Sequence, residues 1–324
     1  EGYFFGFDQS SLVMSFEGVP HSGDISKSVT NGNFELVGNP YTAPISISIF
    51  LNDNSSVISG TVYFWDDGGS NVGGSRGGDY VTANAMGSVS AVQDDGVAGG
   101  QGTAAAGNGA IPAVQGFFVE AIANGDVTFQ QDMQVITSGV NADDNFYRQE
   151  NRISSKIKLI ATGKDFYDET LIGVAVDATS ERDYQYDAVK LMDDGQPGFY
   201  SLIGDERYAI QGIPSDQSSV ALQLDTKETE ITLTPLLSDF EADTEFVLKD
   251  LKNGKRYLLT DEVPVTVTIN SGNFSNRFEL ERISGKVLAA DTDLPDLKVF
   301  GNTETLNIIF SGSASELISV YSLD

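Results

Sequence analysis

The chain has 324 residues, 40% of them hydrophobic, which is enough apolar material to fill the cores of two ordinary domains. Asp and Glu number 47 against 19 Lys and Arg, and a net charge of −28 disfavours binding to phosphate backbones and to anionic lipid headgroups. Nucleic-acid binding and membrane-surface binding are therefore poor hypotheses, and membrane insertion is not expected, because no apolar run approaches the length of a membrane span. Cysteine is absent, so neither a disulfide framework nor a thiolate metal site is present.

Short runs of β-branched and aromatic residues, separated by Gly, Asn, Asp and Ser, recur along the whole chain. Sustained amphipathic helical periodicity is hard to find. The pattern predicts an all-β fold of two consecutive β-sandwich domains, of the jelly-roll or immunoglobulin-like kind, followed by the start of a third small β-sandwich. In the first domain, residues 1–140, clear strands are expected at 45–50, 60–65 and 116–121.

Two other segments of the first domain carry conformational signals. Asn124 and Gly125 form a turn pair after the last of these strands, and they predict that 127–129 pairs back on it as a hairpin. The passage 67–112 is dominated by Gly, Ala, Asn and Ser, with only scattered apolar residues. It is expected to be a long surface loop between two strands.

A polar passage at 137–150 marks the first domain boundary, and the second domain is expected at 144–284. Its predicted strands are spaced about eight to twelve residues apart, as in β-sandwiches. They lie at 153–161, 171–176, 199–202, 208–211, 220–224, 230–234, 246–250, 255–259, 265–269 and 278–282. Asn253 and Gly254 predict a hairpin turn between two of them.

A polar linker at 285–296 separates the second domain from an incomplete third β unit at 297–324. Strands are expected there at 297–300, 305–310 and 317–323. Some thirty residues cannot bury an independent core. The chain also begins and ends in strand-like runs, so we interpret it as a piece of a longer protein.

Particular motifs narrow the class of protein. The first domain contains, in order, 33–41 with its Gly-Asn-Pro-Tyr turn, 62–65 with its Tyr-Phe-Trp strand, 111–119, and 127–129 before Met133. Weaker motifs follow at 152–159, 186–190, 199–202, 208–210 and 276–278. Together they resemble a module common in surface proteins of Bacteroidota. Residues 297–324 resemble the first half of a type A sorting domain of the type IX secretion system, although the Asn-Pro opening usual in that family is missing.

This resemblance implies export across the outer membrane, an extracellular or cell-surface location, and the type IX secretion machinery as a partner. It does not imply a reaction. The leading hypothesis is therefore a non-enzymatic surface module, a structural spacer or adhesin-like element that carries the sorting domain within a larger adhesin. A variant is a self-assembling extracellular filament, in which neighbouring copies complete the open strand edges.

A carbohydrate-binding module is the first alternative function. Tyr63, Trp65 and Tyr80 offer flat rings on which a pyranose can stack, and strand alternation places Tyr63 and Trp65 on one face, opposite Phe64. Such a face is as readily part of a core, because the single Trp of a sandwich is usually buried. Polysaccharide is the ligand this hypothesis names.

Catalysis finds little support. His21 is the only histidine, and it stands in a Pro-His-Ser-Gly-Asp sequence typical of a turn. A glycan hydrolase with two carboxylates is the least favoured alternative, because among 47 acidic residues some pair meets the required separation by chance and no pair is singled out. We therefore predict no enzyme and no catalytic residues.

Two other motifs invite a functional interpretation. The pairs Asp66–Asp67 and Asp193–Asp194 are candidate Ca²⁺ ligands, but neither has the spacing of a dedicated calcium loop, and a turn is the favoured interpretation. No other cofactor is expected. Gly38, Asn39, Pro40 and Tyr41 are interpreted as a structural corner, in which Gly and Asn accept positive φ, Pro fixes φ and Tyr41 packs over the turn.

Overall fold

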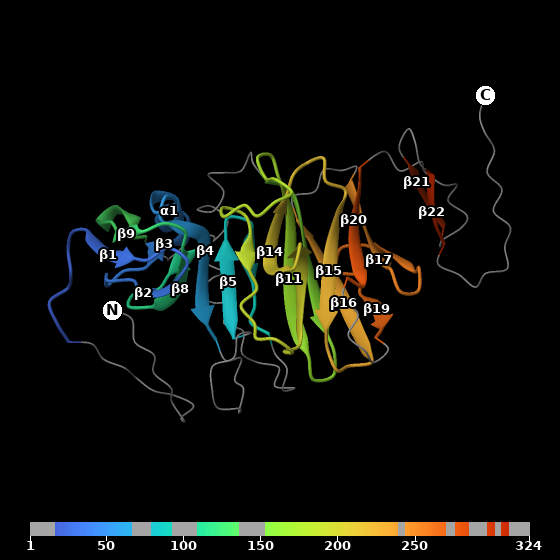
Figure 1. Cartoon of the computed structure of the whole chain (residues 1–324), viewed down its shortest axis with the longest axis horizontal. Coiled ribbons are helices and arrows are strands. Elements are labelled where there is room, and N and C mark those ends of the chain that lie inside the picture. Colours follow the sequence, from blue (N-terminus) through green and yellow to red (C-terminus); the bar gives the residue numbers. More distant parts are fainter. Residues whose placement is uncertain are drawn as a thin grey trace.

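The computed structural model describes residues 17–66, 79–92, 109–135, 153–238, 244–269, 276–284, 297–301 and 306–310 (Figure 1). Within these ranges the regular elements are β-strands, apart from one α-helix of seven residues and one short 3-10 helix. The predicted all-β class is confirmed. No helix in the described ranges is long and apolar enough to span a membrane.

The N-terminal unit comprises the described residues from 17 to 135. Its elements are β1 (Ile25–Val29), β2 (Phe34–Gly38), β3 (Ile45–Ser46), α1 (Ile47–Asp53), β4 (Ile58–Trp65), β5 (Tyr80–Asn84), β6 (Gly87–Val89), β7 (Ala110–Ile111), β8 (Gly116–Ala121), β9 (Gly125–Phe129) and the 3-10 helix η1 (Gln131–Met133). A five-stranded sheet in the order β2-β8-β4-β5-β6 forms its base. The pairs β1–β9 and β3–β7, together with α1, share one apolar core with this sheet, in which Phe50 of α1 packs against both Phe117 and Phe129.

The prediction of a strand at 45–50 is wrong beyond the first two residues. β3 ends at Ser46, whose side chain caps α1 by accepting a hydrogen bond from the N–H of the third helical residue (3.3 Å). The alternation of Ile and Ser conceals a second spacing, because Ile47, Phe50 and Leu51 stand at i, i+3 and i+4. The helix places all three in the core, where they are buried.

The hairpin expected at Asn124 and Gly125 is also wrong. β9 pairs antiparallel with β1, whereas β8 lies between β2 and β4 in the five-stranded sheet. The Asn124 side-chain carbonyl accepts a hydrogen bond from the N–H of Asn31 in the connection between β1 and β2 (2.9 Å). Asn124 therefore lies where the chain passes from one sheet to another, and it does not form a two-residue hairpin turn.

The passage 67–112 is more than a surface loop. Its described part contains β5, β6 and β7, and β5 pairs with β4 along the whole of its length. Val81, Met86 and Val89 are each 1% exposed, so these scattered apolar residues are core contacts. Apolar residues that are sparse in sequence still specify strands when each of them reaches a core.

The second part of the chain forms one large sheet. Its strands are β10 (Ile153–Thr162), β11 (Tyr167–Ala175), β12 (Ala188–Val189), β13 (Gly198–Ile203), β14 (Glu206–Ile213), β15 (Ser219–Asp225), β16 (Glu230–Ser238), β17 (Thr244–Asp250), β18 (Arg256–Leu259), β19 (Val265–Thr268) and β20 (Phe278–Ser284). All ten strands expected here are confirmed, and β12 was not predicted. Gly254, in the predicted turn between β17 and β18, has φ of 73°.

The order of strands in the large sheet is β18-β17-β20-β15-β13-β14-β11-β10-β16-β19, and β12 pairs with β14. Neighbours are antiparallel except β11 and β14. Leu259 of β18 and Val267 of β19, from the two ends of this order, belong to the same core cluster. The sheet therefore curls around its own core into a near-barrel, which revises the expected sandwich of two separate sheets.

Two further strands, β21 (Leu297–Gly301) and β22 (Leu306–Phe310), form an antiparallel pair. They confirm the first two strands expected after the linker. The third expected strand, at 317–323, lies outside the described residues, and so do the boundary passage 137–150 and the linker 285–296.

A third apolar cluster joins the N-terminal unit to the large sheet, and β6 contacts both β11 and β14. Met86 packs there with Leu171 and Tyr186. Gly60 of β4 donates its N–H to the carbonyl of Tyr184, in the segment that precedes β12 (2.7 Å). The two parts lie one after the other along the longest axis of the molecule (Figure 1).

Gly60→Ala tests this junction. An added Cβ would lie 2.8 Å from the carbonyl oxygen of Gln185 and 3.0 Å from that of Tyr184, so backbone must move. We expect the free energy of unfolding, measured by urea denaturation, to fall by ~1–3 kcal/mol. Gly18→Ala is the matched control, because nothing lies within 4 Å of a Cβ at Gly18. Equal stability of the two variants would contradict close packing at the junction.

Candidate functional site

An aromatic row lies on the face of the five-stranded sheet opposite its core. Phe64 points into that core, and strand alternation puts Tyr63 and Trp65 on the other face, as the sequence predicts. The row consists of Phe34 on β2, Tyr63 and Trp65 on β4, Tyr80 on β5 and Phe118 on β8. Trp65 stands directly opposite Tyr80, and Tyr80 packs edge-on against Phe118 with ring centroids 5.8 Å apart.

The three residues predicted to bind carbohydrate differ in exposure. Tyr63 is fully buried, so its ring cannot stack on a sugar that approaches from solvent. Burial and the nearby charge of Glu120 also raise the pKa of the Tyr63 hydroxyl. Trp65 and Tyr80 are half-buried. Phe34, which sequence reasoning missed, is 39% exposed and packs edge-on against Tyr63.

An ion pair borders this row. Arg182, in the segment between β11 and β12, donates to the Glu120 carboxylate on β8 (2.6 Å), and its guanidinium lies 4.5 Å from the centre of the Tyr184 ring. The side chains of Arg182 and Glu120 are only 22% and 14% exposed. The pair therefore fixes the segment before β12 against the outer face of the five-stranded sheet, and it had no signal in the sequence.

Three of the four candidate calcium ligands lie in the described part of the chain. Asp193 and Asp194 lie in a turn with Gly195 at φ 82°, where the N–H of Asp193 bonds to the Gln196 side chain and Asp194 pairs with Arg207 (2.8 Å). The backbone N–H of Asp66 donates to the carbonyl of Asp79 (2.8 Å), whereas Asp67 lies outside the described residues. Among the residues that the structure describes, no three or more His, Asp or Glu side chains are grouped to hold a metal ion.

The corner predicted at Gly38, Asn39, Pro40 and Tyr41 depends on side chains and not on positive φ. Neither Gly38 nor Asn39 has positive φ. The buried Asn39 amide donates to the carbonyls of Ala43, Ile111 and Pro112 (2.9, 3.2 and 3.0 Å), and its oxygen accepts the N–H of Tyr41 (3.0 Å). The Tyr41 hydroxyl donates to the carbonyls of Gly23 and Phe129 (3.0 and 2.8 Å). The motif thus ties four segments of backbone together.

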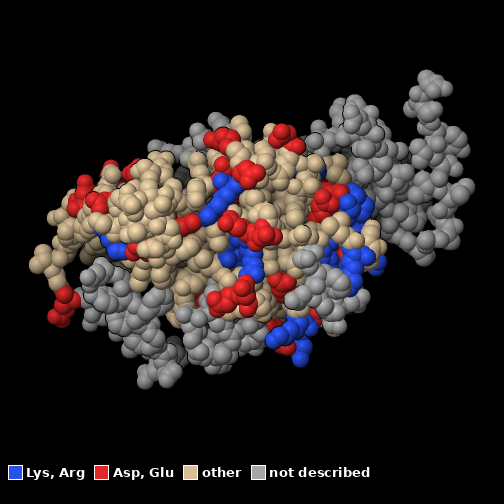
Figure 2. All heavy atoms as spheres, viewed as in Figure 1, with Lys and Arg blue, Asp and Glu red and all other residues tan. Residues whose placement is uncertain are grey.

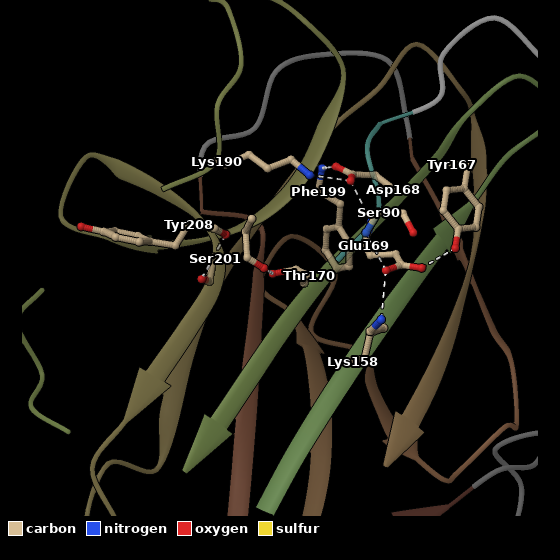
Figure 3. A network of polar contacts seen from close by, with 11 residues as sticks. Ser90, Lys158, Tyr167, Asp168, Glu169, Thr170, Lys190, Phe199, Ser201 and Tyr208 are labelled. Atoms are coloured by element: carbon tan, nitrogen blue, oxygen red, sulfur yellow. Dashed lines mark hydrogen bonds and ion pairs between the residues drawn. The ribbon is translucent and has the colours of Figure 1, made fainter. Parts of the chain in front are cut away.

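A polar network surrounds the start of β11 (Figure 3). The Glu169 carboxylate accepts hydrogen bonds from the N–H of Ser90 (3.0 Å), the Lys158 ammonium (3.2 Å) and the Tyr167 hydroxyl. Burial alone would raise the pKa of Glu169, but these partners outweigh it and lower the pKa. Because Ser90 follows β6, Glu169 joins the N-terminal unit to the large sheet.

The neighbouring residue, Asp168, forms a second buried pair. Its side chain is 0% exposed and contacts the Lys190 ammonium at 2.5 Å, while the Lys190 side chain is 5% exposed. The backbone N–H groups of Phe199 and Glu169 also donate to this carboxylate (2.5 and 2.7 Å). The cost of burial exceeds the effect of these partners and raises the pKa of Asp168.

A third buried pair lies near one end of the strand order of the large sheet. Arg277 binds Asp250 of β17 through two nitrogens (3.0 and 2.6 Å) and also donates to the Thr268 carbonyl (2.7 Å). Hydrogen bonds from Arg277 overcome the effect of burial and lower the pKa of Asp250. Both charges of this pair are therefore balanced by contacts inside the fold.

Asp187 is a buried carboxyl that accepts hydrogen bonds from two backbone N–H groups. It is 1% exposed and accepts the N–H groups of Asp183 and Gly212 (both 2.7 Å). Burial raises the pKa of Asp187 to about 7, assisted by the negative charge of Asp183 and opposed by these hydrogen bonds and Arg182. Asp187 thus fastens the segment before β12 to β14.

Many other charged groups of the described residues lie at the surface. On the face shown in Figure 2, Lys and Arg side chains gather beside Asp and Glu over the middle of the molecule, and few charges lie over the N-terminal unit. His21 is exposed, with its ring centre 6.5 Å from that of Tyr41.

These observations define an all-β protein in which two β-structures are joined by an apolar cluster and by buried polar contacts. The chain belongs to the family described as a domain of unknown function, DUF8693, whose model matches residues 5–281. The match spans both predicted β-sandwich domains. Comparison with curated proteins and with solved structures gave no match.

Asp187→Asn should change the dependence of stability on pH. Because folding raises this pKa from 3.8 to about 7, the folded chain holds a proton that the unfolded chain releases, so the carboxyl stabilises the fold at low pH. That contribution is complete near pH 4 and is lost as the pH rises to 7. Asn does not titrate and leaves one backbone N–H without an acceptor at every pH.

The quantity to measure is the free energy of unfolding of wild type minus that of the variant, by urea denaturation between pH 4 and 8. We expect this difference to fall by on the order of 2–4 kcal/mol between pH 4 and 7 and to be constant above it. A difference that does not vary with pH would show that the pKa of Asp187 is the same in the folded and the unfolded chain.

Proposed function

We propose that this chain is a non-enzymatic structural module of an exported cell-surface protein, a spacer or adhesin-like element that carries the C-terminal segment resembling a sorting domain. The observation that supports it best is the junction between the N-terminal unit and the large sheet. A spacer must hold its two ends at a fixed separation, whereas units that share a small polar interface move relative to each other.

The junction restricts such motion by several independent contacts. Its apolar cluster contains residues of β6, β11 and β14. Asn84 of β5 donates to the Tyr186 carbonyl (2.7 Å), Ser90 donates to Glu169, and Arg182 pairs with Glu120. These contacts lie on different strands, so a hinge between the two parts would have to break all of them together.

The chemistry of the surface is consistent with an extracellular setting. A net charge of −28 disfavours binding to nucleic acids and anionic membranes, and a chain without cysteine needs no disulfide to fold. The resemblance of 297–324 to a sorting domain names the type IX secretion machinery as the partner in export. Neighbouring copies are the partners if the parent protein assembles into filaments.

Surface display of the parent protein tests this function. The turn at Gly204 and Asp205 joins β13 to β14 and is exposed, so an epitope tag inserted there is expected to leave the sheet intact. In intact cells of the producing organism, we expect antibody to label the tag and extracellular protease to remove it. In cells without the type IX translocon, both signals should disappear while the protein remains detectable after lysis. Labelling only after lysis in otherwise normal cells would refute export to the surface.

Carbohydrate binding is a second candidate, favoured by the half-exposed pair of Trp65 and Tyr80. Their positions directly opposite each other on β4 and β5 give adjacent ring surfaces of the kind that stack on a pyranose. Fully buried Tyr63 takes no part in this surface.

Because Trp65 is the only Trp, its fluorescence reports on this site alone. If the candidate is correct, soluble polysaccharides should shift the emission in a saturable way, and Tyr80→Ala should weaken the apparent affinity by about tenfold, equivalent to ~1.4 kcal/mol. Phe34→Ala is the control for an exposed ring elsewhere in the row and should leave the affinity unchanged. No change in emission over a panel of cell-wall and plant polysaccharides would exclude this function.

A further inference from the structure

Asp168 and Lys190 form a close ion pair in the interior of the fold. The Lys190 Nζ lies 2.5 Å from Asp168 Oδ1, and both side chains are withdrawn from water, at 5% and 0% exposure. Burial of two opposite charges is costly, and their mutual attraction repays that cost only in part. Figure 3 shows the amine directed at the carboxylate.

The carboxylate is also polarised from the backbone. The N–H of Phe199 donates to Oδ2 (2.5 Å) and the N–H of Glu169 donates to Oδ1 (2.7 Å). Once one of these oxygens is protonated, the N–H group bonded to the other is placed to stabilise the negative charge that develops there in a tetrahedral intermediate. The lysine amine is the nucleophile in contact with the same carboxyl group.

We propose that Lys190 and Asp168 condense to an intramolecular isopeptide bond in the folded chain. One proton passes from the ammonium to the carboxylate, which gives a neutral amine and a neutral acid. The amine lone pair then attacks Cγ and forms the Nζ–Cγ bond. One Cγ–O bond breaks, and the oxygen leaves as water after taking a proton from the nitrogen. The products are a secondary amide and one water, so no oxidant, reductant or other reactant is consumed.

Burial favours this reaction at two points. It stabilises the neutral acid relative to the carboxylate, in agreement with the raised pKa of Asp168. It also penalises the charged pair, and the amide carries no charge. Holding the two groups in contact replaces a bimolecular collision by a unimolecular step.

Two other ion pairs in the described part of the chain each lack one of these features. Lys158 lies 3.2 Å from Glu169 and its side chain is 26% exposed, so this pair is longer and less withdrawn from water. Arg277 and Asp250 are as buried as the proposed pair, but a guanidinium stays protonated and is not a nucleophile. The distinction makes Lys158 a matched control for Lys190.

The bond would connect the start of β11 to the residue after β12. It would close a covalent loop in the chain between these two positions. β14 pairs with both of these strands, and the Lys190 N–H donates to the carbonyl of Arg207 on β14 (2.8 Å). A covalent bond at this point would resist separation of β11 and β12 in a chain that has no cysteine. The inference stands on the geometry of the pair and is independent of the proposed function.

Mass spectrometry of the denatured chain tests the proposal. We expect the intact wild-type mass to be about 18 Da below the mass of its sequence, which corresponds to one water. Lys190→Arg keeps the positive charge but cannot form the amide, so its mass should equal that of its sequence. Lys158→Arg should retain the loss. The measurement is made on denatured protein, so it can be made on any of these variants that fails to fold.

Tryptic fragments of the wild type decide the position of the bond. Trypsin does not cleave after an acylated lysine, so fragment 165–182, which contains Asp168, should be recovered joined to fragment 183–207. Cyclisation elsewhere in the chain also removes water, and a mass loss without these joined fragments overturns the proposal. Release of a separate fragment 183–190 as the main product overturns it as well.

Discussion

The burial of charge at the start of β11 constrains more of this structure than any other interaction. Asp168, Glu169 and Thr170 are consecutive, and all three are buried. Successive side chains of a strand point to opposite faces, so β11 places polar groups against apolar surroundings on both of its sides. Each group needs a partner there, because an unpaired buried carboxylate costs several kcal/mol, of order 3–5 where one partner of a buried pair is removed.

Those partners come from distant parts of the chain. Ser90 belongs to the N-terminal unit, Lys190 follows β12, and the Phe199 N–H comes from β13. Thr170 donates to the carbonyl of Ala209 on β14 (3.3 Å). The network can be complete only when all these segments have reached their final positions. Buried polar groups of this kind specify which strands are neighbours, even where an apolar substitute would be equally stable.

Sequence reasoning recovered the strands of the large sheet because their apolar residues alternate and polar turns separate them. It failed where one pattern supports two structures. The segment 45–50 alternates like a strand, yet Ile47, Phe50 and Leu51 also have helical spacing, and only the position of the core decides between them. Pairing failed at β9 for a related reason, since the role of Asn124 depends on Asn31, which is far away in sequence.

The buried pairs could not be predicted from local pattern at all. The strand predicted at 171–176 begins at Leu171, after the polar run Tyr-Asp-Glu-Thr. In the structure the strand begins at Tyr167 and the polar residues are inside. Asp168, Glu169 and Thr170 directly precede an apolar stretch, but this pattern by itself does not indicate burial. Its meaning depends on Lys158 and Lys190, whose positions only the fold supplies.

At the corner around Asn39 and in the segment before β12, polar side chains hold separate parts of the backbone together. Asn39 holds three carbonyls with a single amide, so a sharp motif in the sequence serves folding and not a ligand. The segment before β12 does the same between two larger bodies, through Arg182, Asp187 and the carbonyls of Tyr184 and Tyr186. These polar groups already make internal contacts. In the described part of the chain, a ligand is therefore more readily bound by the exposed aromatic rings than by the buried charges. This division between internal polar contacts and an aromatic outer face follows from one requirement, that charges removed from water must be paired.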